Sequence, residues 1–467
     1  MTTLLALALL AIPVSDRRQL FIDRKFIEKE QGIELRVHSP RKAGPISLAG
    51  DDGPMGGTTN CVMKDGAVYR LWYLGRNGFV HARSRDGVHF EKDRLVLGGG
   101  AGGIKGIPRG LMVFIDPNAP AAERYRMVTR AEEISPVLQL FSSPDGLTFK
   151  HTHRDVITFH PPKPHHLDSQ NVIFWDARIG KYAAYVRRNL QEKGSQGRGL
   201  ARAESADLAR WPEVQEMPVV LPPWRGGQVD VYTNGTILYP WAENAYLMFP
   251  CMYYHYTTRQ SEFAGGAPVN AGVIDAYFAA SRDGVKWDTY QGEPWVRLGM
   301  EGEFDSKRIY MAYGMVPAPN GRELYMYYMG TNEPHGWNRD DRNNRLLIAA
   351  NVAPRPEARA LGRLVLRRDG FVSVHASEAG GEFTTPAIAF RGRELLLNVD
   401  TSALGEAQVE IQDENGKTLA ASGLIHTAND PDRVVKFDGE PLERLAGKPV
   451  RLRFLLRNAD VYAFQFR

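Results

Sequence analysis

The stretch Ser84-Arg85-Asp86-Gly87-Val88-His89-Phe90 decides the fold, because the chain repeats its pattern. Close copies occupy 143–149 and 281–287, and a degenerate copy at 205–211 has Leu208 in place of the glycine. Starts separated by about 60 to 76 residues are typical of a repeat architecture. An Asp-Gly pair makes a tight turn, and the aromatic residue that closes each copy can pack this turn onto the next unit. The pattern predicts a radial repeat.

Pairs of short apolar segments separated by turn signals lie between these copies. The first pair is 60–63 and 68–73, joined through Lys64-Asp65-Gly66. Four comparable units follow, around 110–128, 171–186, 236–249 and 309–328. Four strands in each of five units predict a five-bladed β-propeller, an all-β fold.

The sequence pattern changes after the linker Ala353-Pro354-Arg355-Pro356-Glu357. Alternating segments such as 394–399 and 450–455 predict a C-terminal β-sandwich. We therefore expect a propeller over 16–355 and a sandwich over 364–467.

Residues 1–15 contain the apolar run Leu4–Ile12, which is too short to span a bilayer and is typical of a signal-peptide core. It predicts a secreted or periplasmic protein. The alternative is an apolar N-terminal strand in a cytoplasmic one. Cys61 and Cys251 fall in different predicted blades, so we expect two buried, unpaired thiols.

Composition argues against two classes of partner. The chain has 467 residues and a net charge of +4 that is spread along its length. This balance gives no reason to expect nucleic acid or an anionic membrane surface as a partner. The oligomeric state is left open.

Polar residues stand just before the innermost strand of each predicted blade. Because these strands begin at one mouth of the central channel, the residues are expected to converge there. They are Asp51, Asp52 and Asn60 in the first blade, Arg109 in the second, Asp168 in the third, Asp230 in the fourth, and Glu303 with Asp305 in the fifth.

Several acids at one mouth fit glycoside hydrolysis, in which one carboxyl protonates the leaving oxygen and a second attacks or activates water. Crowding would raise the pKa of one carboxyl and keep its proton available. We expect Glu303 as proton donor, Asp168 as base or nucleophile and Asp230 as the group that tunes them. The expected substrate-binding residues are Asn60, Arg109, Arg187, Asp305 and His335.

Each of these residues also has an ordinary structural explanation. An acid before a strand is often a turn former in water. Arg187 can pair with an acid between blades, and His335 can be a solvated loop residue.

No cofactor or metal is predicted. His165 and His166 beside Asp168 lack a second histidine cluster at ligand spacing. A structural Ca²⁺ in the channel is not indicated. The chain has no Gly-x-Ser-x-Gly elbow, and neither cysteine has a neighbouring histidine, which disfavours a Ser or Cys nucleophile.

These segments resemble the five-bladed propeller glycosidases of families 32 and 43, most closely a bacterial family-32-like group. The resemblance runs nearly the whole chain, through 20–23, 168–176, 304–310 and 368–373. It implies a glycosidase with acids at the channel mouth. The chain departs from true fructan hydrolases, since it has Gly50-Asp51-Asp52-Gly53-Pro54 where their first catalytic motif stands, and lacks their Arg-Asp-Pro and Glu-Cys motifs.

Three alternatives remain beside an oligo- or polysaccharide hydrolase. A non-catalytic carbohydrate-binding propeller would use the acids to hold sugar hydroxyls and the aromatics Trp224, Tyr232 and Trp337 to stack on rings. A sialidase-like propeller would share the repeated turn but needs an arginine cluster. A phosphorolytic glycosidase would depend on phosphate. The sugar and its linkage are not specified by the sequence.

Overall fold

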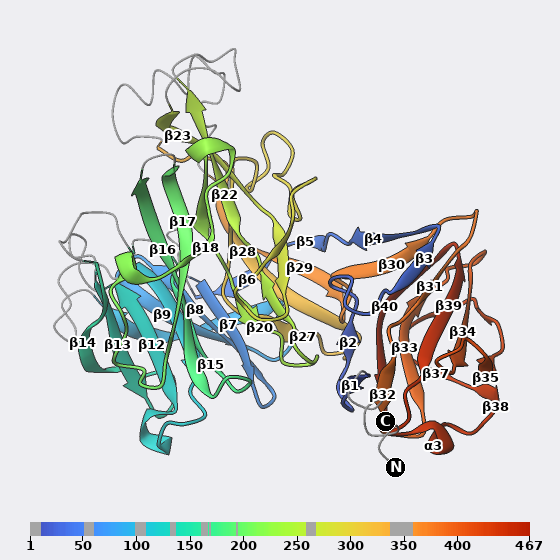
Figure 1. The fold of residues 1–467 in the computed structure, drawn as a ribbon. Coiled ribbons are helices and arrows are strands. Elements are labelled where there is room, and N and C mark those ends of the chain that lie inside the picture. The colour runs from blue at the N-terminus through green and yellow to red at the C-terminus, as the bar shows by residue number, and fades with distance from the viewer. Residues whose placement is uncertain are drawn as a thin grey trace.

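The computed structural model describes residues 11–50, 60–98, 109–130, 137–159, 167, 170–192, 195–257, 268–336 and 358–467. It has two lobes, a larger one of strand groups coloured blue to orange and a smaller one that is mostly red (Figure 1). Within these ranges the helical segments are one turn of α-helix and three short 3-10 turns. They are α3 (Leu442–Leu445), η2 (Ala121–Glu123), η3 (Val214–Glu216) and η4 (Arg225–Gly227). The predicted all-β class is confirmed.

The first three strand groups of the larger lobe are antiparallel sheets of four consecutive strands, and the first carries β6 (Ser47–Ala49) as a parallel addition. The first contains β7 (Asn60–Asp65), β8 (Val68–Gly75), β9 (Gly78–Ser84) and β10 (His89–Gly98). The second contains β11 (Arg109–Ile115), β12 (Tyr125–Arg130), β13 (Val137–Ser143) and β14 (Lys150–Thr158). The third contains β15 (Val172–Asp176), β16 (Lys181–Glu192), β17 (Ser195–Ser205) and β18 (Val219–Leu221).

The fourth group is divided between two sheets. One part contains β19 (Val229–Thr233), β22 (Cys251–Thr257) and β23 (Pro268–Ala276). The other contains β20 (Ile237–Leu238), β21 (Tyr246–Met248), β24 (Phe278–Ser281) and β25 (Asp288–Tyr290).

The fifth group takes its outer strand from the beginning of the chain. It contains β26 (Arg308–Met311), β27 (Val316–Pro317), β28 (Glu323–Thr331), β29 (Arg359–Arg367) and β5 (Arg41–Pro45). β5 pairs antiparallel with β29, and β6 then pairs with β10 of the first group. The segment 41–49 therefore joins the last group to the first.

The repeated Asp-Gly turn has the same structure in its three full copies. In the first copy Ser84 Oγ accepts a hydrogen bond from Gly87 N–H at 2.9 Å, and Asp86 Oδ1 accepts one from Val88 N–H at 2.8 Å. Gly87, Gly146 and Gly284 have φ of 73°, 74° and 75°, a left-handed conformation that favours glycine. This explains why the copy with Leu208 is degenerate.

Each full turn docks on the group that precedes it around the ring. The carbonyl of Gly146 accepts a hydrogen bond from Trp72 Nε1 at 2.9 Å, and that of Gly284 accepts one from the Tyr185 hydroxyl at 2.8 Å. The carbonyl of Gly87 accepts one from the Tyr327 hydroxyl of the fifth group at 2.7 Å. The sequence predicted docking on the next unit, whereas the partner is the preceding one.

Contacts between neighbouring strand groups continue around the whole lobe. They are Cys61 Sγ to Val113 O, Ile173 N to Met112 Sδ, Gly235 N to Gln170 Oε1, Met311 N to Cys251 Sγ, and Tyr313 N to Asn60 O. These bonds join the five groups in order and return from the fifth to the first. Cys61 and Cys251 are buried free thiols, as predicted.

The smaller lobe is a sandwich of two sheets around one apolar core. One sheet contains β37 (Asn429–Val435), β33 (Leu395–Asp400), β40 (Ala459–Phe466), β30 (Val372–Ala376), β4 (Ile33–Val37) and β2 (Gln19–Leu20). The other contains β3 (Lys29–Gln31), β31 (Gly381–Thr384), β39 (Arg451–Arg457), β34 (Glu406–Gln412), β35 (Thr418–Ser422), β36 (Ile425–His426) and β38 (Phe437–Gly439). β1 (Ile12–Val14) pairs with β32 (Ile388–Phe390) beside them.

The predicted domain boundaries at 16, 355 and 364 differ from the structure. Strands β1 to β4 belong to the sandwich, where they pair with its strands, and the side chains of Val14, Phe21 and Phe26 in the same segment enter its core. β29 belongs to the propeller-like lobe, where it pairs with β28. Residues 11–15, placed within the predicted signal peptide, are folded against the sandwich, and export remains a prediction.

A buried ionic contact fixes the two lobes to each other. Arg18 Nε lies 3.1 Å from Asp369 Oδ2, and the Tyr239 hydroxyl donates to Asp369 Oδ1 at 2.6 Å. Burial raises the pKa of Asp369, although the charge of Arg18 and the hydrogen bond from Tyr239 oppose this. The contact ties the N-terminal segment to the fourth group.

Candidate functional site

The candidate site lies where the inner strands of the third, fourth and fifth groups begin. The inner strands of the fifth and first groups run in the same direction, as the parallel bridge of Cys61 with Tyr313 indicates. In the fourth group β19 has the same direction as β23, which pairs parallel with β26 of the fifth. The first residues of these inner strands therefore share one mouth of the channel. Among the described residues, the third and fourth groups supply the carboxylate of Asp230, several cations and a group of aromatic rings to this region.

Asp230 is the central carboxylate and is 1% exposed. The Arg198 backbone N–H donates to its Oδ1 at 2.7 Å, His255 Nε2 donates to its Oδ2 at 2.8 Å, and the Arg198 guanidinium also binds Oδ2. Burial by itself would raise the pKa of Asp230, but the His255 hydrogen bond and the Arg198 charge outweigh it and hold the pKa below its usual value. Asp230 is therefore ionised at neutral pH.

His335 connects two tyrosines next to this carboxylate. Its Nε2 lies 3.1 Å from the Tyr232 hydroxyl, and its Nδ1 lies 3.1 Å from the Tyr253 hydroxyl. A neutral imidazole donates through one nitrogen and accepts through the other, so one tyrosine donates and the other accepts. Tyr253 also packs on His255, with ring centroids 3.9 Å apart, which links His335 to the Asp230 network.

The His335 loop is held by the backbone of β23. Gly272 and His335 exchange two backbone hydrogen bonds, of 2.8 and 3.1 Å. A Cβ at Gly272 would collide with the carbonyl oxygen of Tyr254, so only glycine allows this close approach.

Two arginines approach the ring of Tyr232. The guanidinium carbon of Arg187 lies 4.7 Å from the ring centroid, and that of Arg198 lies 5.6 Å from it. Arg187 is 2% exposed, and its backbone N–H donates to Asn171 Oδ1 at 3.1 Å. Arg187, Tyr232, His335 and Asp230 are thus parts of one network.

The other predicted acids have different surroundings. Asp305 is buried and accepts hydrogen bonds from Lys42 Nζ at 2.6 Å and the Tyr328 hydroxyl at 2.8 Å. Glu303 is exposed and accepts one from Met300 N–H at 2.9 Å. In the described part of the chain, no hydrogen bond or ion pair links Glu303 or Asp305 to Asp230.

The remaining predicted residues are placed only in part. Asp51, Asp52 and Asp168 lie outside the described residues. Arg109 opens β11, but its side chain is also outside them. Asn60 is buried at the start of β7, where its carbonyl accepts the Tyr313 N–H at 2.8 Å.

Sequence reasoning missed Arg198 and His255, the two residues that bind Asp230. They come from β17 and β22, whereas only the starts of inner strands were considered. The alternation in Tyr253-Tyr254-His255 places Tyr253 and His255 on one face of a strand, and this signal was available. Across the described ranges, no three His, Cys, Asp or Glu side chains are grouped as metal ligands.

Comparison with known proteins gave structural likenesses only. No family model and no curated protein matches the sequence. A structure titled "Glycoside hydrolase" has a TM-score of 0.49 and 14% identity, over 70% of this chain and 92% of its own. A thermostable family-43 glycoside hydrolase has a TM-score of 0.46 and 17% identity, over 71% and 96%. An N-acetylgalactosamine deacetylase from F. plautii has a TM-score of 0.42 and 13% identity, over 77% and 96%.

Likeness at these scores assigns neither an activity nor a site residue to this chain. No helix within the described ranges has the length and apolar character needed to cross a membrane.

Proposed function

We propose that the protein is a glycoside hydrolase that cleaves an oligo- or polysaccharide at this mouth of the channel. The observation that supports it best is the ionised Asp230, held by Arg198 and His255 beside the Tyr232–His335–Tyr253 group. Glycoside cleavage passes through a positively charged, oxocarbenium-like transition state, which a fixed negative charge stabilises.

The role proposed for Asp230 follows from its surroundings, and the roles proposed for Asp168 and Glu303 follow from their positions before inner strands. Asp230 has a lowered pKa and is engaged on both oxygens, so it is proposed as the stabilising charge. Asp168 is proposed as base or nucleophile and Glu303 as the proton donor. Arg187, His335, Asn60, Arg109 and Asp305 are the proposed substrate-binding residues.

A product-release screen over plant and algal polysaccharides tests the activity, and two variants test the assignment. Glu303→Gln and Asp168→Asn should each lower turnover by about 100-fold or more, as expected for loss of an acid or base. Because the carboxylate of Glu303 accepts one backbone hydrogen bond in an exposed turn, the melting temperature of its variant should change little. Asp438→Asn, an exposed acid of the sandwich, is the matched control. Full activity in both site variants would refute the assignment.

A non-catalytic carbohydrate-binding propeller is the second candidate. It is favoured by the complete engagement of Asp230, since both its oxygens already accept hydrogen bonds. Binding in a glycan array without any product from the bound glycans would support this candidate over the hydrolase.

A further inference from the structure

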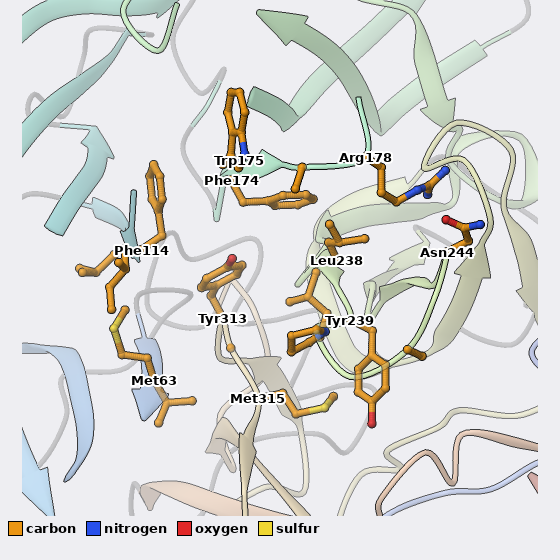
Figure 2. Close-up of a pocket in the computed structure, with 18 of the residues that line it drawn as sticks. Met63, Phe114, Phe174, Trp175, Arg178, Leu238, Tyr239, Asn244, Tyr313 and Met315 are labelled. Atoms are coloured by element: carbon orange, nitrogen blue, oxygen red, sulfur yellow. The ribbon is translucent and has the colours of Figure 1, made fainter. Parts of the chain in front are cut away.

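A cavity of about 560 Å³ lies at the other mouth of the channel. It is lined by the distal parts of the inner strands and the segments that follow them, including Met63, Phe114, Phe174, Trp175, Leu238 and Met315 (Figure 2). The candidate site lies where the same strands begin. We call this cavity the distal chamber.

Buried hydrogen bonds separate the distal chamber from the candidate site. Gln170 Nε2 donates to the Met311 carbonyl at 3.2 Å, and Gln170 Oε1 accepts from Gly235 N–H at 2.9 Å. Gln170 and Asn234 are each 1% exposed. The distal chamber shares no lining residue with the Asp230 network, so it is a separate place on the molecule.

The wall of the chamber is apolar yet incompletely covered. Met63, Trp175, Leu238 and Met315 are only partly buried, and they line the cavity. Covering apolar surface of this kind is favourable by about 25 cal/mol for each Å² removed from water. A volume of this size is typical of sites for small organic ligands.

Tyr313 supplies a polar atom inside the apolar wall. Its backbone is fixed by hydrogen bonds of 2.8 Å with Asn60 and Val62, and its ring packs against three separate apolar clusters. Its hydroxyl has no hydrogen-bond partner among the described residues, and in Figure 2 the ring lies in the middle of the chamber. Burial raises the pKa of Tyr313, so the hydroxyl stays neutral and can donate a hydrogen bond.

Cationic and amide groups gather at one edge of the chamber. Arg178 donates to the carbonyl of Arg282 at 2.7 Å, and Arg17 donates to the carbonyl of Pro240 at 2.6 Å. Neither guanidinium forms an ion pair with a carboxylate within the described ranges. The amide of Asn244 lies beside Arg178 in Figure 2. The Arg178 guanidinium also lies over the ring of Tyr246, 4.8 Å from its centroid, and the carboxylates of Asp176 and Glu243 are close to this edge. An anionic group would therefore be held by direct contact with the two guanidinium groups and not by a net positive charge.

We propose that the distal chamber is a second ligand site, which binds a small apolar anion such as an aromatic carboxylate or sulfonate. The apolar part would lie among Phe114, Phe174 and Leu238, and the anionic group would meet Arg178. This inference does not depend on the proposed hydrolase activity.

A pair of fluorescent probes tests the proposal on the full chain. 8-Anilinonaphthalene-1-sulfonate is an apolar anion, and N-phenyl-1-naphthylamine is its neutral analogue without the sulfonate. We expect saturable binding of the anion at one site. Arg178→Gln should weaken binding of the anion by about tenfold, the effect of losing one charge-assisted hydrogen bond, and leave the neutral probe unchanged. Arg85→Gln, which removes an exposed arginine that does not line the chamber, is the control.

A second variant tests the apolar part. Leu238→Trp should fill the chamber and weaken the binding of both probes. If this variant folds poorly, Met315→Trp fills the chamber from the fifth strand group and should have the same effect. Absence of saturable binding would overturn the proposal. So would unchanged binding in these variants, or equal weakening of both probes by Arg178→Gln.

Discussion

The Nδ1 atom of His335 lies 3.1 Å from the hydroxyl of Tyr253, and this contact joins the fifth strand group to the second strand of the fourth. His335 is 3% exposed and is bonded through its other nitrogen to Tyr232. The imidazole is therefore oriented from both sides, as required of a group that positions a substrate or a proton.

Removing the Tyr253 hydroxyl tests this orientation. Tyr253→Phe should lower the free energy of unfolding by about 0.5–1.5 kcal/mol, the range for one hydrogen bond. Urea unfolding measures this loss, and Tyr325→Phe is the control because its hydroxyl has no hydrogen bond within the described ranges. An unchanged stability would mean that the contact contributes nothing.

Adding one methyl group at Gly272 tests the anchor of the His335 loop. Gly272→Ala should destabilise the fold by about 1–3 kcal/mol, as overpacking does, because the new Cβ would meet the Tyr254 carbonyl. Gly292→Ala, at a position with open space, should have little effect by the same thermal unfolding measurement. Equal melting temperatures for the two variants would contradict the packing seen at Gly272.

Asp230 should make the free energy of unfolding decrease at low pH. Its folded pKa is below that of the unfolded chain, so its contribution is fully present above the unfolded value of about 3.9 and is lost as pH falls through the folded value. Asp230→Asn leaves Arg198 without its carboxylate and should cost about 3 kcal/mol at pH 7. Urea unfolding from pH 7 to pH 3 should show this difference shrinking below about pH 4, whereas Asp438→Asn should show no such trend.

Asp275 should give the free energy of unfolding the opposite pH dependence, a decrease as pH rises. Burial raises its pKa to about 7, and its Oδ1 has no hydrogen-bond partner among the described residues. Between about pH 4 and 7 the folded protein keeps a proton that the unfolded chain has released, so stability falls as pH rises through this window and then levels off.

Asp275→Asn should remove that dependence and stabilise the protein at pH 8 by about 1–3 kcal/mol, because the amide puts no charge in the buried position. Thermal unfolding of the variant and the wild type at pH 5 and pH 8 measures this difference in stability. A variant less stable than the wild type at pH 8 would show that the carboxylate has a favourable partner.

The local features of the fold could be predicted from sequence, because their causes are local. The Ser84–Gly87 turn depends on side chains within three residues, and its recurrence located the strand groups. The domain boundaries could not be predicted in this way. β4 pairs with β30 and β5 pairs with β29, which are more than 300 positions away, and no short pattern records such partners.

The candidate site was predictable to a similar extent. Asp230 was predicted from the start of an inner strand, Arg187 from the end of the segment 181–186 and His335 from the loop after a strand pair. They lie in one network, although their role in catalysis remains a prediction. The pairing of Asp305 with Lys42 could not be predicted, since it requires β5 to join the fifth group. Arg198 was missed because it lies in β17, the third strand of its group, whereas only the starts of inner strands were considered.

The pairing of β5 with β29 has a consequence for biosynthesis. Residues 41–45 leave the ribosome long before residues 359–367 are translated, so an emerging chain carries an unmatched strand through most of its elongation. Exposed strand edges of this kind are prone to aggregation. Closure of the ring is therefore a late event, and a nascent chain released before residue 359 would lack both β29, which pairs with β5, and the sandwich strands that follow it.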